Sequence, residues 1–164
     1  MSDITLYTTD PLTGTGYREA TFEELMTAAR QALSRKVRRG TGMTSPRVTA
    51  DYLVARYAGL QHEVFTLIYL DNHCRLIAAD DLFRGTIDSA SVHPREVVKE
   101  ALKHNAAKVI FAHLHPSGIA EPSSADERIT QRLKEALSLV DIRVLDHIIV
   151  AGGETTSFAD RGLL

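Results

Sequence analysis

Two histidines, a serine and an aspartate follow one another closely at the end of an apolar run. His113 and His115 flank Leu114 in a segment that is predicted to be extended, so both imidazoles should point to the same side. Asp126, further along the chain, could complete three protein ligands on one metal ion and leave a fourth position open to water. An open position is typical of a hydrolytic zinc site rather than of a closed structural one.

Each part of this cluster also has an explanation without a metal. A His-x-His pair is common in strands, Ser123-x-x-Asp126 fits the capping box of a helix, and Glu63 is a carboxylate at a strand end. The conjunction favours a site, because suitable ligand types occur in order around a loop that joins a strand to a helix.

Apolar periodicity predicts the elements that would position these residues. The first strand pair should be a hairpin, which makes the sheet mixed and the fold an α/β sandwich. We expect a loose arm over 1–20 with a short strand at 4–7, helices from 21 to about 40, from 46, from 94 and over 124–140, and strands over 64–70, 75–83, 108–112, 142–150 and 155–158.

The order Glu63, His113-x-His115-Pro116, Ser123-x-x-Asp126 resembles the JAMM motif of the MPN+ (Mov34/JAB) metallohydrolases. Within that family the chain resembles the RadC-like, UPF0758-type members over about residues 45–164. The resemblance implies a three-layer MPN/JAB sandwich, similar to cytidine deaminase, with helices flanking a mixed central sheet; residues 1–44 would form an N-terminal arm and helix. Four sequence motifs carry this resemblance: Leu82-Phe83-x-Gly85-Thr86, Val92-His93-Pro94-Arg95-Glu96, His115-Pro116-Ser117-Gly118 and Leu145-Asp146-His147-Ile148-Ile149.

The resemblance also implies an activity and roles for the site residues. One Zn²⁺ per chain would be held by His113, His115 and Asp126, and the reaction would be hydrolysis of a protein or peptide substrate, in the manner of a metallopeptidase or isopeptidase. Glu63 would take a proton from the zinc-bound water and pass it to the leaving amine. Ser123 would hydrogen-bond the tetrahedral oxyanion if its hydroxyl is not used to cap the helix.

The chain departs from the RadC-like pattern in two places. Leu114 stands where those proteins usually have Asn, so we expect a polar contact beside the site to be lost. A helix-hairpin-helix-like segment is not recognisable in residues 1–44. The alternative function is a DNA-repair-associated or partner-binding module with weak or lost catalysis. A basic stretch with no acidic residue inside it supports that alternative, although it also fits a solvated helix end. Its members are Arg30, Arg35, Lys36, Arg38, Arg39 and Arg47.

Length, charge and cysteine content limit the number of domains, the location and the kinds of zinc enzyme that this chain can be. A chain of 164 residues with a net charge of -2 suits one globular domain without a general attraction to nucleic acid or anionic membranes. No apolar run is long enough to span a bilayer and no secretory signal is visible, so a cytoplasmic protein without membrane association is expected. Cys74 is the only cysteine, which excludes an internal disulfide and the two-cysteine ligand set of zinc nucleobase deaminases. It is predicted to be a small buried group.

The other histidines are weaker candidates. His147 is expected to be a hydrogen-bonded core residue, with support of the site as the alternative. His93, with Arg95, fits a hydrogen-bonding role at a helix start. The remaining three are predicted to be solvated at element ends: His62, His73 and His104.

Overall fold

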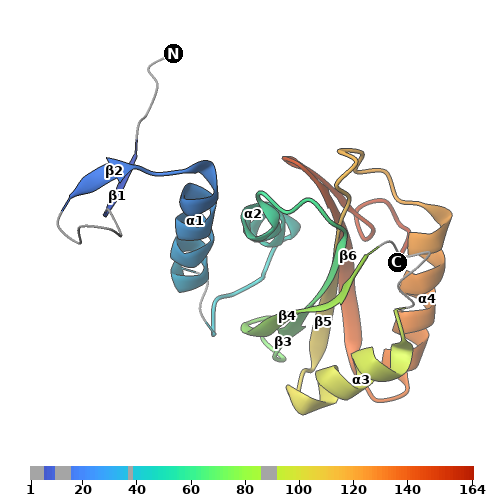
Figure 1. Ribbon diagram of the computed structural model, residues 1–164. Coiled ribbons are helices and arrows are strands. Elements are labelled where there is room, and N and C mark those ends of the chain that lie inside the picture. Colours follow the sequence, from blue (N-terminus) through green and yellow to red (C-terminus); the bar gives the residue numbers. More distant parts are fainter. Residues whose placement is uncertain (1–5, 10–15, 37–38, 86–91) are drawn as a thin grey trace.

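A five-stranded mixed sheet forms the centre of the molecule in the computed structural model (Figure 1). The strand order is β4-β3-β5-β6-β7, with β5 and β6 parallel and all other neighbours antiparallel. The structure describes residues 6–9, 16–36, 39–85 and 92–164. The elements are β1 Tyr7–Thr9, β2 Tyr17–Glu19, α1 Phe22–Lys36, α2 Pro46–Tyr57, β3 Val64–Leu70, β4 Leu76–Arg84, α3 Pro94–Lys103, β5 Lys108–Leu114, α4 Ser124–Ser138, β6 Arg143–Ala151 and β7 Glu154–Ser157.

Helices cover both faces of the sheet. Figure 1 shows α2 against one face, with α1 beyond it, and α3 and α4 against the other. Two apolar cores result, one between the sheet and α2 and one between the sheet and α3 with α4. Every residue of β3 is buried, because this inner strand is covered on both sides. The predicted three-layer α/β sandwich with a mixed sheet is therefore confirmed. Most element ends are shifted by at most two residues, but α1 ends at Lys36, before the predicted end near residue 40.

Polar side chains cap the N-termini of α1 and α2. The Thr21 hydroxyl accepts a hydrogen bond from the Glu24 backbone N–H, and the Glu24 carboxylate accepts one from the Thr21 N–H. Ser45 caps α2 by accepting from the Val48 N–H, and Pro46 occupies the first helical position. These capping bonds satisfy donors that a helix N-terminus cannot pair internally.

The N-terminal segment is more ordered than expected. Instead of a loose arm, β1 and β2 form an antiparallel hairpin, which an ion pair between Arg18 and Glu24 joins to α1. Of the strand predicted at 4–7, residues 4 and 5 lie outside the described residues, and Tyr7 is the first residue of β1. Phe22, the first residue of α1, is 67% exposed, and the main packing partner of α1 is α2.

Two further predictions concern the surface. Cys74 is not buried: it is half-exposed in the turn between β3 and β4, with a positive φ of 57° and its Sγ 3.3 Å from the Lys108 Nζ. Within the basic stretch, only Arg39 and Arg47 have described side chains, and both are exposed. Among the described helices, none has the length and apolar character needed to cross a membrane.

Candidate metal centre

Both histidines lie at the C-terminal end of β5, the central strand of the sheet. His113 is its penultimate residue, and His115 continues the extended path by donating its backbone N–H to the Val150 carbonyl of β6 at 2.8 Å. The two rings meet edge to face with centroids 4.6 Å apart, as the alternation of side chains predicts. Leu114 points to the opposite face and joins the core under α2. The expected loss of a polar contact beside the ligands is therefore wrong, since Leu114 does not line the site.

The first turn of α4 supplies the carboxylate. The Ser123 hydroxyl accepts from the Asp126 backbone N–H at 3.2 Å, and the Asp126 carboxylate accepts from the Ser123 N–H at 2.8 Å. The Ser123 hydroxyl also donates to Asp126 Oδ2 at 2.6 Å. The capping box and the ligand site are thus the same structure: the bonds that start the helix hold Asp126 against the end of β5.

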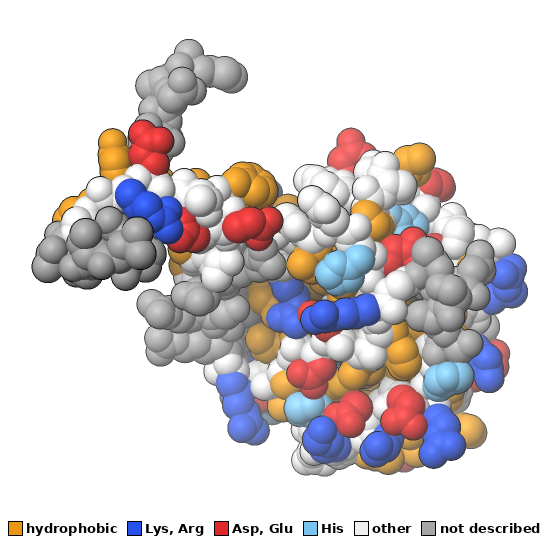
Figure 2. All heavy atoms as spheres, in the orientation of Figure 1, with side chains coloured by type: hydrophobic (Ala, Val, Ile, Leu, Met, Phe, Trp, Pro, Cys, Tyr) orange, Lys and Arg blue, Asp and Glu red, His pale blue; other side chains and the backbone are white. Residues whose placement is uncertain are grey.

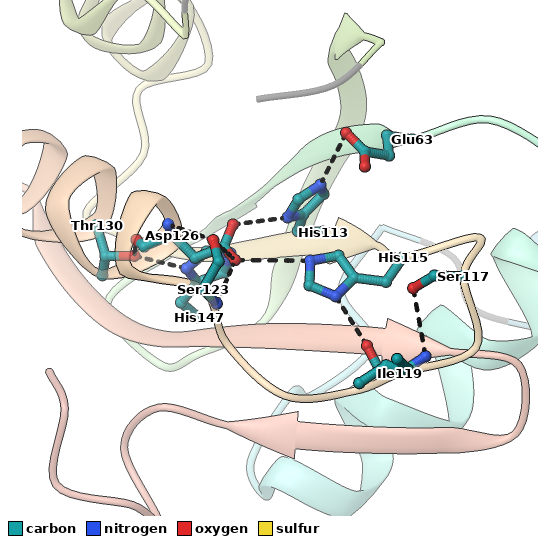
Figure 3. A network of polar contacts seen from close by, with 9 residues as sticks. All are labelled: Glu63, His113, His115, Ser117, Ile119, Ser123, Asp126, Thr130 and His147. Atoms are coloured by element: carbon teal, nitrogen blue, oxygen red, sulfur yellow. Dashed lines mark hydrogen bonds and ion pairs between the residues drawn. The ribbon is translucent and has the colours of Figure 1, made fainter. Parts of the chain in front are cut away.

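Asp126 lies between the two imidazoles (Figure 3). Its Oδ1 is 3.0 Å from His113 Nδ1, and its Oδ2 is 3.6 Å from His115 Nε2. Glu63, just before β3, places its Oε2 3.9 Å from His113 Nε2 and keeps a partly exposed side chain. His113 and Asp126 are almost fully buried, whereas His115 is less so. The structure therefore brings all five predicted site residues together.

The polar contacts keep Asp126 ionised. Burial would raise the pKa of Asp126, but hydrogen bonds from His113, His115 and Ser123 together bring it well below its usual range. The hydrogen bond with Asp126 raises the pKa of His115, and burial only partly opposes this effect. The site thus holds one permanent negative charge between two imidazoles.

These residues fit a zinc ion. His113, His115 and Asp126 each offer one donor atom, and the three atoms lie within 4.8 Å of one another. Two imidazoles and a carboxylate are a usual protein ligand set of hydrolytic zinc. His113 Nε2 is buried and has no hydrogen-bond partner among the described residues, which is costly for a polar atom unless a ligand uses it. The His115 Nδ1 donates to the Ile119 carbonyl at 2.9 Å, which leaves the Nε2 lone pair available on the side of Asp126.

Thr130 is a supporting residue that the sequence reading missed. Its hydroxyl donates to the Asp126 carbonyl at 2.6 Å and contacts His147 Nδ1, also at 2.6 Å. Its spacing of one helical turn after Asp126 was the available signal, because threonine hydroxyls commonly bond the carbonyl four residues earlier. His147 is fully buried and hydrogen-bonded, so its predicted place in the core is confirmed.

Two other histidines differ in part from the predictions. His93 stands at a helix start as expected, at the N-cap of α3, but its side chain makes no capping hydrogen bond. His104 is not a solvated end residue: its ring stacks on Tyr69 at 4.2 Å, and its Nε2 lies 2.9 Å from the Asp80 carboxylate. His62 and His73 are exposed as expected.

Comparison with known proteins agrees with this geometry. Residues 43–163 match the family model described as the RadC-like JAB domain. The UPF0758 protein of Nitrosococcus oceani is 65% identical over 135 residues, which are 82% of this chain and 60% of that protein. The UPF0758 protein Tgr7_0100 of Thioalkalivibrio sulfidiphilus is 56% identical over 145 residues, 88% of this chain and 65% of that protein.

The UPF0758 protein of Vibrio cholerae serotype O1 (El Tor Inaba) is 58% identical over 136 residues, 83% of this chain and 85% of that protein. The chain thus spans less than two thirds of the length of the first two relatives and most of the third. The metal-site residues all lie inside the segment that matches the family model. By sequence match and by fold, the chain belongs to the RadC-like JAB domain family.

Proposed function

We propose that this protein is a zinc-dependent hydrolase that cleaves an amide bond in a protein or peptide substrate. The observation that carries the proposal is the buried triad of His113, His115 and Asp126 with the Glu63 carboxylate beside it. The JAB superfamily includes metallohydrolases, and its members often bind zinc. A bound zinc would supply a Lewis acid that makes water acidic near neutral pH and polarises a carbonyl.

Glu63 is suited to proton transfer. Its carboxylate is partly exposed at the edge of the site, so it can reach both an attacking water and a departing amine. In hydrolysis, the water oxygen bonds to the carbonyl carbon while its proton moves to Glu63. When the carbon–nitrogen bond breaks, the same proton goes from Glu63 to the amine nitrogen.

Ser123 contributes in a different way from the role that the resemblance implies. Its hydroxyl proton is directed at Asp126 Oδ2, so the side chain orients a ligand. Contact with an oxyanion would require the hydroxyl to leave the carboxylate, and this contact stays a prediction. The alternative as a DNA-associated module also stays a prediction, because most side chains of the basic stretch lie outside the described residues.

The proposal is tested with zinc-loaded protein and a peptide library, scored by mass spectrometry for new amino termini. We expect cleavage that chelation abolishes and zinc restores. Glu63→Gln should retain zinc yet lose roughly 10²- to 10⁴-fold in rate, whereas Glu96→Gln, an exposed carboxylate on α3, should behave as wild type. Undiminished turnover by zinc-loaded Glu63→Gln, or no cleavage by the wild type, would contradict the proposal.

A further inference from the structure

A second group of potential ligands lies between β4 and the end of α3. Asp80 comes from β4, Glu100 from the last turn of α3, and His104 from its C-cap. One donor atom of each lies within 4.8 Å of the others; we call these residues the α3 cluster. Glu100 and His104 are one helical turn apart and so share a face of the helix. Acidic, basic and histidine side chains gather over α3 along the lower edge of the face in Figure 2.

A buried tyrosine provides a second, independent observation. Tyr69 is completely buried, and its hydroxyl has no hydrogen-bond partner among the described residues. Its ring stacks on His104, with centroids 4.2 Å apart and planes at 27°. Burial, and then the nearby charges of Asp80 and Glu100, raise the pKa of Tyr69, so the hydroxyl stays protonated beside the cluster. An unpaired buried hydroxyl is costly, and a ligand or its water would give it a partner.

We propose that the α3 cluster binds a second zinc ion through His104 Nε2 and one carboxylate oxygen each from Asp80 and Glu100. One imidazole and two carboxylates favour zinc over Mg²⁺ or Ca²⁺, which prefer oxygen ligands throughout. The side chains are partly exposed, which gives the ion access from solvent. This site would link the edge strand β4 to α3, and it does not depend on the proposed hydrolase activity.

Lys103 determines how tightly the ion is held. Its Nζ lies 2.8 Å from Glu100 Oε2, and the pKa of Lys103 is raised by the hydrogen bond to Glu100 and by the charges of Glu100 and Asp80. The lysine thus offsets one of the two carboxylate charges of the cluster, and its charge would repel a zinc ion bound there. We therefore expect the α3 cluster to bind zinc more weakly than the triad of His113, His115 and Asp126.

The test is equilibrium dialysis of metal-free protein against zinc, with circular dichroism to check folding. Wild type should bind two zinc ions per chain. His104→Phe, which keeps the stacking on Tyr69, and Asp80→Asn should each lose the weaker ion and retain the tighter one. His113→Ala should lose the tighter ion alone, so failure at one site is distinguishable from failure at the other.

Lysine variants provide a second test, because removing one particular lysine should tighten zinc binding at the α3 cluster and would not affect unspecific binding in this way. Lys103→Met should tighten the weaker site by roughly two- to fivefold. The matched control Lys99→Met should have a smaller effect, because Lys99 pairs with Glu96 and its charge acts on Glu100 only from a distance. Zinc binding by the wild type that neither His104→Phe nor Asp80→Asn reduces, whether one ion is bound or two, or equal effects of the two lysine variants, would overturn the proposal.

Discussion

His147 shows how one residue beneath the site is held in a single protonation state. The Thr130 hydroxyl donates its only proton to the Asp126 carbonyl. His147 Nδ1 must therefore donate to the threonine oxygen. Burial, and then the neighbouring His113, lower the pKa of His147 to about 3. His147 is therefore neutral in the folded protein at pH values well above 3.

Stability should fall in acid because of this histidine. The pKa of His147 is lower in the folded chain than the ordinary value of 6.5, so below pH 6.5 the unfolded state binds a proton that the folded state does not. Between about pH 6 and pH 3, His147 should reduce the unfolding free energy by up to about 1.4 kcal/mol per pH unit. Urea denaturation at several pH values gives the slope of the unfolding free energy against pH. In His147→Gln this slope should be shallower by the amount that corresponds to about one bound proton. Equal slopes in both proteins would contradict the neutral assignment.

The sequence predicts the metal ligands better than the residues that contact and orient their neighbours. His113, His115 and Asp126 were identifiable because few residue types bind zinc and they occur in order. Thr130 and the stacked His104 were not, because their roles depend on which side chains the packed helices bring near them. Leu114 is next to both ligands in the sequence, but its side chain lies on the opposite face of β5.

The N-terminus of α4 couples helix formation to the site. Ser123→Ala would remove the hydroxyl that caps the helix and contacts Asp126. We expect a loss of about 1 kcal/mol in unfolding free energy and weaker zinc binding, measured by urea denaturation and by competition with a chelator. Ser123→Thr keeps the hydroxyl and should stay close to wild type. If Ala and Thr variants were indistinguishable, the cap would not be what holds Asp126.

Strand β5 separates the site from the opposite core. Leu114 is 4% exposed and packs under α2, so Leu114→Ala should lower the unfolding free energy by roughly 2 to 5 kcal/mol. Zinc content should not change, because the side chain faces away from the ligands. The control Leu139→Ala removes a side chain that is 86% exposed and should have little effect. Loss of zinc in Leu114→Ala would place the residue in the site.

Among the elements, those of the buried sheet were predictable and those of the N-terminus were not. The β3 run and the caps of α2 and α4 carry strong local signals, since burial and capping restrict residue type. The β1–β2 hairpin has exposed apolar residues and three-residue strands, so its sequence lacks a clear period.

The segment 40–43, just before α2, is hydrogen-bonded to the start of β4 and to the turn before it. Backbone hydrogen bonds join Gly40 and Thr41 to Leu76 and join Met43 to Cys74, and the Met43 side chain belongs to the core under α2. A chain over 39–164 should therefore fold cooperatively and keep its zinc. A chain over 45–164, cut at the predicted domain boundary, lacks Met43. Its unfolding free energy should be about 2 to 3 kcal/mol lower than that of the 39–164 chain. Thermal denaturation of the two chains compares them directly; equal stability would mean that 39–44 is dispensable.

The central claim concerns a metal held by the buried triad, and metal analysis tests it most directly. Purified wild type, His113→Ala and Asp126→Ala should be compared after dialysis against zinc at a concentration too low to fill the weaker α3 cluster. The account predicts about one zinc per chain in the wild type and little in either variant. Equal zinc in all three proteins, or none in the wild type, would contradict it.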